Sequence, residues 1–253
     1  MLDEALPDAE RKTAILILDS GIEAMERAPT SLPSFIQGDS PLDNLARRYL
    51  EALLQTNRQR ASKLIAEAFA RGASIRDIYM HVFERTQREI GRLWQINKIN
   101  VAQEHFCTAA TQMIMSQLYP YIFSGKQKDR SIIVACVGGE LHEIGARMVA
   151  DLFELEGWDS TFLGANTPPE GIVAMVKANR NDVVALSTTM TFNIQHTVEI
   201  VRMLRQKVTE PLKVLVGGYA FNMSPGLWKK IGADGYAADA DTAILTAQKL
   251  IAV

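Results

Sequence analysis

The stretch Ser131–Gly145, with the sequence SIIVACVGGELHEIG, constrains the fold more than any other part of the chain. Its first seven residues are mostly small or β-branched and apolar, which is typical of a strand buried on both faces of a parallel sheet. Two glycines, Glu140 and His142 follow, and Glu143–Leu155 then has the apolar spacing of an amphipathic helix. The order strand, loop, helix predicts that His142 lies at the carboxyl end of a strand, the edge where open α/β sheets bind ligands.

Strand and helix patterns alternate from residue 129 to residue 253. Strands are predicted at Ser131–Val137, Ser160–Leu163, Val183–Thr188, Lys213–Val216 and Gly235–Ala237. Helical patterns follow the second to fifth strands at Pro169–Ala178, Asn193–Arg205, Ser224–Ile231 and Thr242–Ile251. Five short parallel strands with helical crossovers predict a flavodoxin-like (Rossmann-type) doubly wound sheet with strand order 2-1-3-4-5. Residues that follow the first and third strands then flank the crevice of the sheet.

The preceding part of the chain, residues 42–124, is helical in pattern throughout. Four apolar stripes are separated by short polar or glycine-containing turns, and Ser74 and Asn100 are predicted N-caps. This pattern favours a four-helix bundle. Residues 1–41 form a leader, with an amphipathic helix predicted at Asp8–Arg27 and then a linker rich in proline. We interpret the leader as an accessory helix or a dimerisation arm.

Composition excludes several classes of function. A net charge of −2 argues against non-specific binding to DNA, and the leader has no basic cluster. No apolar run reaches the ~18 residues expected of a membrane span. Cys107 and Cys136 lie in apolar patterns and are predicted to be buried free thiols, which fits a cytoplasmic protein. We see no nucleophile–base pair, hydrolytic metal set or phosphate loop, so we do not expect the chain to be an enzyme by itself.

Polar and small residues follow three of the predicted strands. Glu140, His142 and Gly145 follow the first strand, a Ser-Thr-Thr segment from Ser187 to Thr189 ends the third, and Gly217–Gly218 ends the fourth. Each feature alone is an ordinary turn glycine, solvated histidine or strand-end hydroxyl. In this order, on these strand ends, they resemble the cobalamin-binding domain family.

The resemblance implies that His142 is the lower cobalt ligand. It also implies that Glu140 holds the other ring nitrogen, which fixes the tautomer and raises the basicity of the imidazole. The family's usual acid is aspartate, so Glu140 adds one methylene. Small residues are expected to leave a slot for the nucleotide tail of the cofactor; the residues expected to bind it are Gly145, Ser187, Thr189, Gly217 and Gly218.

The end of the helical segment resembles a second pattern. Trp94, nine further residues and then Glu104-His105 look like the signature of light-sensing cobalamin regulators, namely the carotenoid-gene photoreceptors and the antirepressors of photosynthesis genes. The likeness implies that Trp94 packs against an upper axial group and that Glu104 bonds an adenosyl group. Some of these sensors carry a histidine directly after the tryptophan, where this chain has Gln95. His105 is therefore the candidate upper ligand after photolysis.

Taken together, these patterns predict a cobalamin-binding photoreceptor without a DNA-binding domain. Light would remove the upper ligand of the cobalt. We expect this ligand to be an adenosyl group, and a methyl or hydroxyl group is the alternative. The change would be passed to a transcription factor or another effector, and we expect a homodimer. One alternative is the corrinoid carrier protein of a methyltransferase system, which needs the same loop and sheet. Another is a sensor with an additional tetrapyrrole, a bilin or haem.

Overall fold

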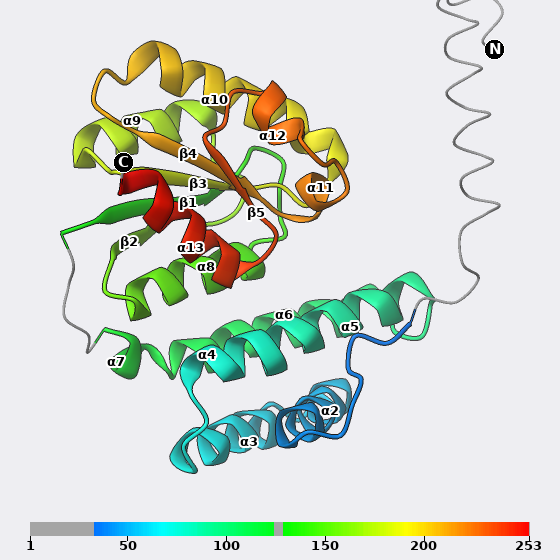
Figure 1. Cartoon of the computed structure of the whole chain (residues 1–253). Coiled ribbons are helices and arrows are strands. Elements are labelled where there is room, and N and C mark those ends of the chain that lie inside the picture. The colour runs from blue at the N-terminus through cyan, green and yellow to red at the C-terminus, as the bar shows by residue number, and fades with distance from the viewer. Residues whose placement is uncertain (1–32, 124–128, 253) are drawn as a thin grey trace, which may run out of the picture. The chain divides into compact units, whose positions relative to one another are not determined.

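The computed structural model of the protein describes residues 33–123 and 129–252 (Figure 1). All described helices and strands belong to one compact unit, Ile36–Val253. The predicted helix Asp8–Arg27 lies outside the described residues.

Helices alone make up the first part of this unit. They are α2 (Pro41–Leu54), α3 (Arg58–Ala70), α4 (Ile75–Asp77), α5 (Glu84–Gln95), α6 (Val101–Ser116) and the short α7 (Tyr119–Ile122). A π-helical segment, Ile78–Phe83, joins α4 to α5, so these form one continuous helical run. The side chain of Asn100 caps α6 and Gln103 bonds back to the cap backbone, as predicted. The predicted helical region is therefore present, with its third helix interrupted by a wider turn.

The second part is a parallel sheet of five strands. Its strands are β1 (Ser131–Cys136), β2 (Asp159–Phe162), β3 (Val183–Ser187), β4 (Lys213–Gly217) and β5 (Gly235–Ala237). Their order β2-β1-β3-β4-β5, with every neighbouring pair parallel, confirms the predicted fold class. The larger helices are α8 (Ile144–Leu155), α9 (Pro169–Asn179), α10 (Ile194–Lys207) and α13 (Ala240–Ile251).

One predicted helix differs from the structure. Instead of a helix at Ser224–Ile231, two four-residue helices follow β4, namely α11 (Tyr219–Asn222) and α12 (Leu227–Lys230). Gly226 lies between them in the left-handed region, with φ +78°. A segment of four residues is too short to show helical periodicity, which is why α11 escaped prediction.

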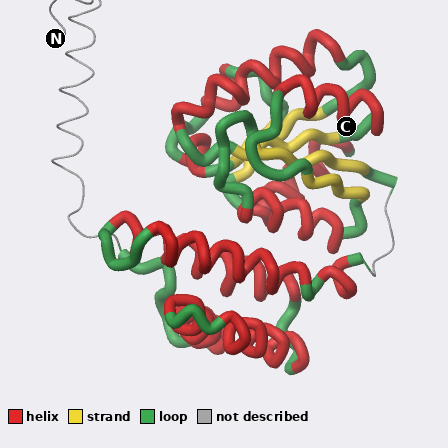
Figure 2. Tube along the Cα trace, turned by 180° about the vertical axis from the view of Figure 1, so that it is seen from behind, coloured by secondary structure: helices red, strands yellow, loops and turns green. Residues whose placement is uncertain are grey.

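Alternate strand residues fill two apolar layers on opposite faces of the sheet. On one face, Ile132, Val134 and Cys136 pack with residues of α8 and α13. On the other face, Ile133 and Ala135 pack with residues of α9 and α10. Figure 2 shows helices on both sides of the strands. This two-faced burial explains why β1 reads as a continuous apolar run.

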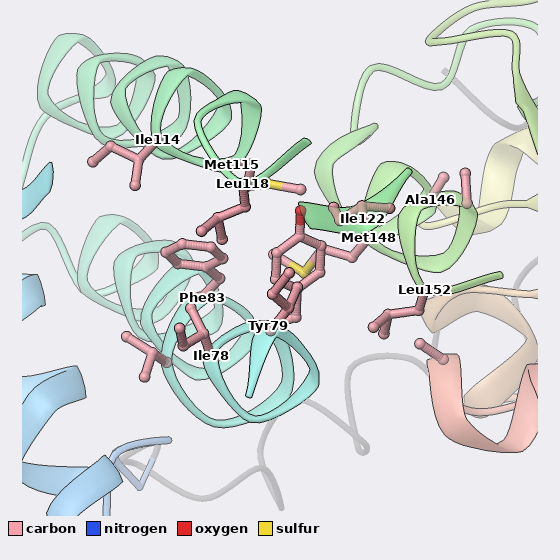
Figure 3. Packing of buried hydrophobic residues seen from close by; sticks show 14 of the residues in the cluster. Ile78, Tyr79, Phe83, Ile114, Met115, Leu118, Ile122, Ala146, Met148 and Leu152 are labelled. Carbon is pink, nitrogen blue, oxygen red and sulfur yellow. The ribbon is translucent and has the colours of Figure 1, made fainter. Parts of the chain in front are cut away.

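The helical region shares a core with the α8 face of the sheet. Figure 3 shows Tyr79, Met115 and Ile122 from the helical region in the same apolar cluster as Met148 and Leu152 of α8. Helix α8 begins just after His142, so this packing brings the helical region and the His142 loop together. Among residues 33–123 and 129–252, no helix is long and apolar enough to cross a membrane. Both cysteines are free and buried, as predicted.

A buried carboxylate lies in this shared core and makes a testable contribution to stability. Asp151 of α8 is 8% exposed and accepts a hydrogen bond of 2.9 Å from the Tyr79 hydroxyl. Burial raises its pKa to about 6, although the Tyr79 hydrogen bond and the Arg147 charge lower it. A carboxyl group with a raised pKa in the folded state favours folding when protonated, so the protein loses stability as pH rises from about 4 to about 6.

We therefore expect Asp151→Asn to stabilise the protein at pH 8, because the amide oxygen still accepts from Tyr79 without a buried charge. The expected gain is about 1–2 kcal/mol at pH 8 and close to zero at pH 4. Urea unfolding of both proteins at the two pH values measures it. The same difference in unfolding free energy at both pH values would show that Asp151 titrates normally.

Candidate functional site

The loop after β1 places the Glu140 carboxylate in contact with the His142 ring. Glu140 is fully buried, and its Oε1 lies 2.5 Å from His142 Nδ1. Its Oε2 accepts hydrogen bonds from the backbone N–H groups of Thr189 (2.8 Å) and Met190 (2.9 Å) and lies 3.3 Å from Asn193 Nδ2. The buried carboxylate is therefore held from two sides, by its own loop and by the loop after β3.

These contacts decide the charge of Glu140. Burial alone would raise its pKa, but hydrogen bonds from the His142 side chain and from the backbone of Met190, His142 and Thr189 lower the pKa to about 2. The hydrogen bond to Glu140 raises the pKa of His142, burial opposes this, and the charges of Glu140 and Glu104 add to it. A carboxylate can only accept, so Nδ1 carries the proton of the neutral ring. The other nitrogen, Nε2, is left for a ligand, on a side chain that is 59% exposed.

Two asparagines that the sequence analysis did not single out hold this loop. Asn166, in the loop after β2, accepts from Gly139 N–H (2.7 Å) and donates its own N–H to the Glu140 carbonyl (2.9 Å). Its backbone is left-handed, with φ +49°, a conformation that asparagine tolerates better than most residues. Asn193, on the opposite side, contacts the Glu140 carboxylate and is 2% exposed.

The predicted small residues divide into two kinds. At Gly145 an added Cβ would meet no atom within 4 Å, so the start of α8 is open. At Gly217 an added Cβ would lie 2.9 Å from the Ala237 carbonyl oxygen, and at Gly218 (φ +95°) it would collide with the Thr188 backbone. The packing of neighbouring backbone thus requires glycine at positions 217 and 218, whether or not these residues also contact a ligand. Gly145 is the predicted glycine that leaves free space.

The two remaining residues predicted at this edge end β3. Ser187 is half-buried and is paired in register with Cys136 and Gly217 of the neighbouring strands. Thr189 takes part through its backbone N–H, which holds Glu140. The structure thus gives Thr189 a supporting role beside His142.

The helical region contributes a second carboxylate–imidazole pair. In the first turn of α6, His105 Nδ1 lies 2.6 Å from Glu104 Oε2, and the other oxygen of Glu104 accepts from the Thr108 hydroxyl (2.9 Å). The His105 side chain is 74% exposed, and Trp94, at the end of α5, is 48% exposed. The negative charge of Glu104 contributes to the raised pKa of His142, so this turn of α6 lies within electrostatic reach of the His142 loop.

This arrangement fits a metal that arrives inside a macrocycle. Across the described residues, no group of three or more histidine, cysteine or acidic side chains could hold a bare ion. His142 instead offers one exposed ring nitrogen. Large apolar side chains lie exposed in the loops around it, including Leu141 (73%) and Phe192 (65%). One exposed ring nitrogen, an apolar surround and open space at Gly145 would suit a corrin ring.

Comparison with known proteins agrees with this geometry. Two family models, each described as a B12 binding domain, match residues 130–245 and 45–119. The chain is 22% identical to dimethylamine corrinoid protein 3 of Methanosarcina acetivorans, over 83% of this chain and 98% of that protein. It is 27% identical to a corrinoid protein of Desulfitobacterium hafniense, over 64% of this chain and 76% of that one. The structure of the Methanosarcina barkeri monomethylamine corrinoid protein has the same fold, with a TM-score of 0.71 over 83% of this chain and 99% of that chain, at 22% identity.

These relatives correct the predicted function. They are corrinoid proteins, and those of Methanosarcina are named for methylamines, so the prediction of a photoreceptor that signals to a transcription factor or other effector is wrong. Part of the pattern that suggested it has an ordinary local cause. Trp94 lies in the last turn of α5, Asn100 caps α6, and Glu104 supplies the acid favoured in a first helical turn.

The helical region and the sheet each match a B12 binding domain, and the His142 loop has the donor that a corrinoid needs. Residues 45–119 and 130–245 belong to the B12-binding domain family.

Proposed function

We propose that the chain is the corrinoid carrier of a methyltransferase system, which holds a methylated corrinoid and presents it to partner enzymes. The observation that carries this proposal is the exposed His142 imidazole, whose Nδ1 is fixed by a fully buried carboxylate. Relatives matched over most of their length and named for methylamines support a small methylated amine as the methyl source. The chain is then a carrier and not an enzyme by itself. The predicted cytoplasmic location stays part of this proposal.

When bound, the corrinoid supplies a cobalt ion that carries the methyl group. The chain's own residues prepare the place for it. His142 Nε2 would ligate the metal from below, while Glu140 keeps the proton on Nδ1 and prevents the ring from turning. Methylcobalamin is the form that this role requires, and no additional tetrapyrrole is needed.

The residues predicted in the helical region and along the sheet edge would surround the corrinoid. Trp94 and the Glu104–His105 pair would face the upper side, where His105 is a candidate ligand when no methyl group is bound. The open space at Gly145 would admit the nucleotide tail. Ser187, Thr189, Gly217 and Gly218 would line the same edge through the ends of β3 and β4.

Methyl transfer to the loaded chain tests the proposal. The purified chain is loaded with hydroxocobalamin, reduced, and incubated with dimethylamine and a dimethylamine-dependent methyltransferase. We expect methylcobalamin to form on the chain only when amine and enzyme are both present, as followed by absorbance. Stable corrinoid binding without methylation, using mono-, di- and trimethylamine with their methyltransferases, would contradict the carrier function. Failure to bind any corrinoid would contradict it more directly.

A further inference from the structure

Glu143, the residue directly after His142, connects three segments of the chain. Its Oε1 accepts a hydrogen bond of 2.7 Å from Gln112 Nε2 on α6. Its Oε2 accepts one of 3.1 Å from the backbone N–H of Ala165, in the loop between β2 and α9. Both carboxylate oxygens of this half-buried side chain are thus engaged. An ionised acceptor makes hydrogen bonds of the stronger kind.

The segments that Glu143 joins are the ones that face the proposed cofactor. Gln112 follows His105 by seven residues, which is two helical turns, so both lie on the same face of α6. The loop that contains Ala165 also contains Asn166, which bonds the backbone at Gly139 and Glu140. Glu143 therefore ties the His105 face of α6 to the loop that presents His142.

We propose that Glu143 is a positioning residue that couples the seating of α6 to the presentation of His142. The inference rests on the proposed function, because it assumes that a corrinoid lies between α6 and the His142 loop. When the Gln112 link is intact, helix and loop are held at one spacing, and the His142 imidazole would be presented to the metal in one position. When the link is broken, α6 and the loop separate. His142 then loses the support that the neighbouring residue, Glu143, gives it through Gln112.

A charge swap tests the link. Gln112→Glu places two carboxylates face to face, and their repulsion opens the contact. Glu143→Gln in the same chain removes the repulsion, since the amide oxygen can still accept from Ala165 N–H while the amide N–H₂ donates to the new carboxylate. Glu143→Gln alone should have a smaller effect than Gln112→Glu, because the Gln112 amide can turn to accept but the charged acceptor is lost. Glu154→Gln is the matched control, as Glu154 accepts from Ser160 N–H at the other end of α8.

The readout is the absorbance spectrum of bound methylcobalamin, which distinguishes imidazole-coordinated from uncoordinated cobalt, together with the rate of cofactor release. Neither measurement needs a partner enzyme. We expect Gln112→Glu to release cofactor about tenfold faster, the size of effect typical of outer-shell contacts, and to lose coordinated cobalt. The double variant should return to within about twofold of the unsubstituted chain on both measures, and Glu154→Gln should change neither.

Three outcomes would overturn the coupling. Gln112→Glu could match the unsubstituted chain, Glu143→Gln could fail to rescue it, or Glu154→Gln could have the same effect. If Gln112→Glu does not fold, Gln112→Ala replaces it, with a smaller loss expected of the same two quantities. The unsubstituted chain is a separate check: methylcobalamin bound without imidazole coordination would contradict the proposed function itself, whatever the variants do.

Discussion

Replacing His142 by alanine is expected to remove imidazole coordination and to weaken corrinoid binding by more than about a hundredfold, the most that loss of an outer-shell contact usually costs. His142 supplies the free Nε2 at this edge of the sheet, and the described residues offer no cluster of side chains that could hold the metal instead. The variant should fold normally, because the side chain is 59% exposed and contributes little to the core. Equilibrium dialysis with methylcobalamin measures the affinity, and the absorbance spectrum reports the coordination.

His81→Ala is the control for this prediction. His81 lies in the helical region, where it lines a hollow with Asp43 and Arg85, so the same substitution there should leave affinity and spectrum unchanged. An unchanged spectrum in His142→Ala would show that another group ligates the metal. Equal losses in both variants would point to a general effect on folding.

The fold was predictable because its signals are local and repeated. The apolar run of β1 and the alternation of strands with helices specify a doubly wound sheet, and the capping pattern at Asn100 places the start of α6. The prediction failed at a short helix. The helix α11 has four residues and no periodicity, so nothing distinguished it from the loop predicted there.

The site was predictable in part. Glu140 and His142 are two residues apart, and the predicted contact between them is present. The supporting residues were not predictable, because their partners are distant in sequence: Asn166 bonds a residue 27 positions away, Gln112 one 31 positions away and Asn193 one 53 positions away. An asparagine or glutamine of this kind has no local pattern that separates it from any other polar residue.

The error in function has a different origin. Trp94, Glu104 and His105 were interpreted as a light sensor's signature, but an acid such as Glu104 is also favoured in the first turn of a helix. Asn97 has φ +56°, Asn100 caps α6 and Glu104 lies in its first turn. A motif whose members also satisfy local structure carries less functional information than one that does not. The buried Glu140 both holds its own loop and orients the His142 ring, and it is the more informative residue.

Replacing Glu140 by alanine is expected to destabilise the protein itself, by about 2–4 kcal/mol at pH 7. Glu140 is fully buried, and its loss leaves the backbone N–H groups of Thr189 and Met190 without their acceptor. The loops after β1 and β3 would then lose the contact that joins them. Chemical unfolding of the cofactor-free chain measures this effect directly, without any assumption about the cofactor.

The pH dependence separates this cause from simple loss of packing. The pKa of Glu140 is lowered from 4.5 to about 2 in the folded chain, so its contribution to stability is present above about pH 4.5 and is lost as pH falls toward 2. The difference in unfolding free energy between the unsubstituted chain and Glu140→Ala should therefore shrink between pH 5 and pH 3. Glu154→Ala is the control, because burial raises the pKa of Glu154 and the difference should then not shrink. A constant difference for Glu140→Ala would mean that its side chain acts through its volume, and the charged hydrogen bonds beneath His142 would contribute nothing to holding the loop.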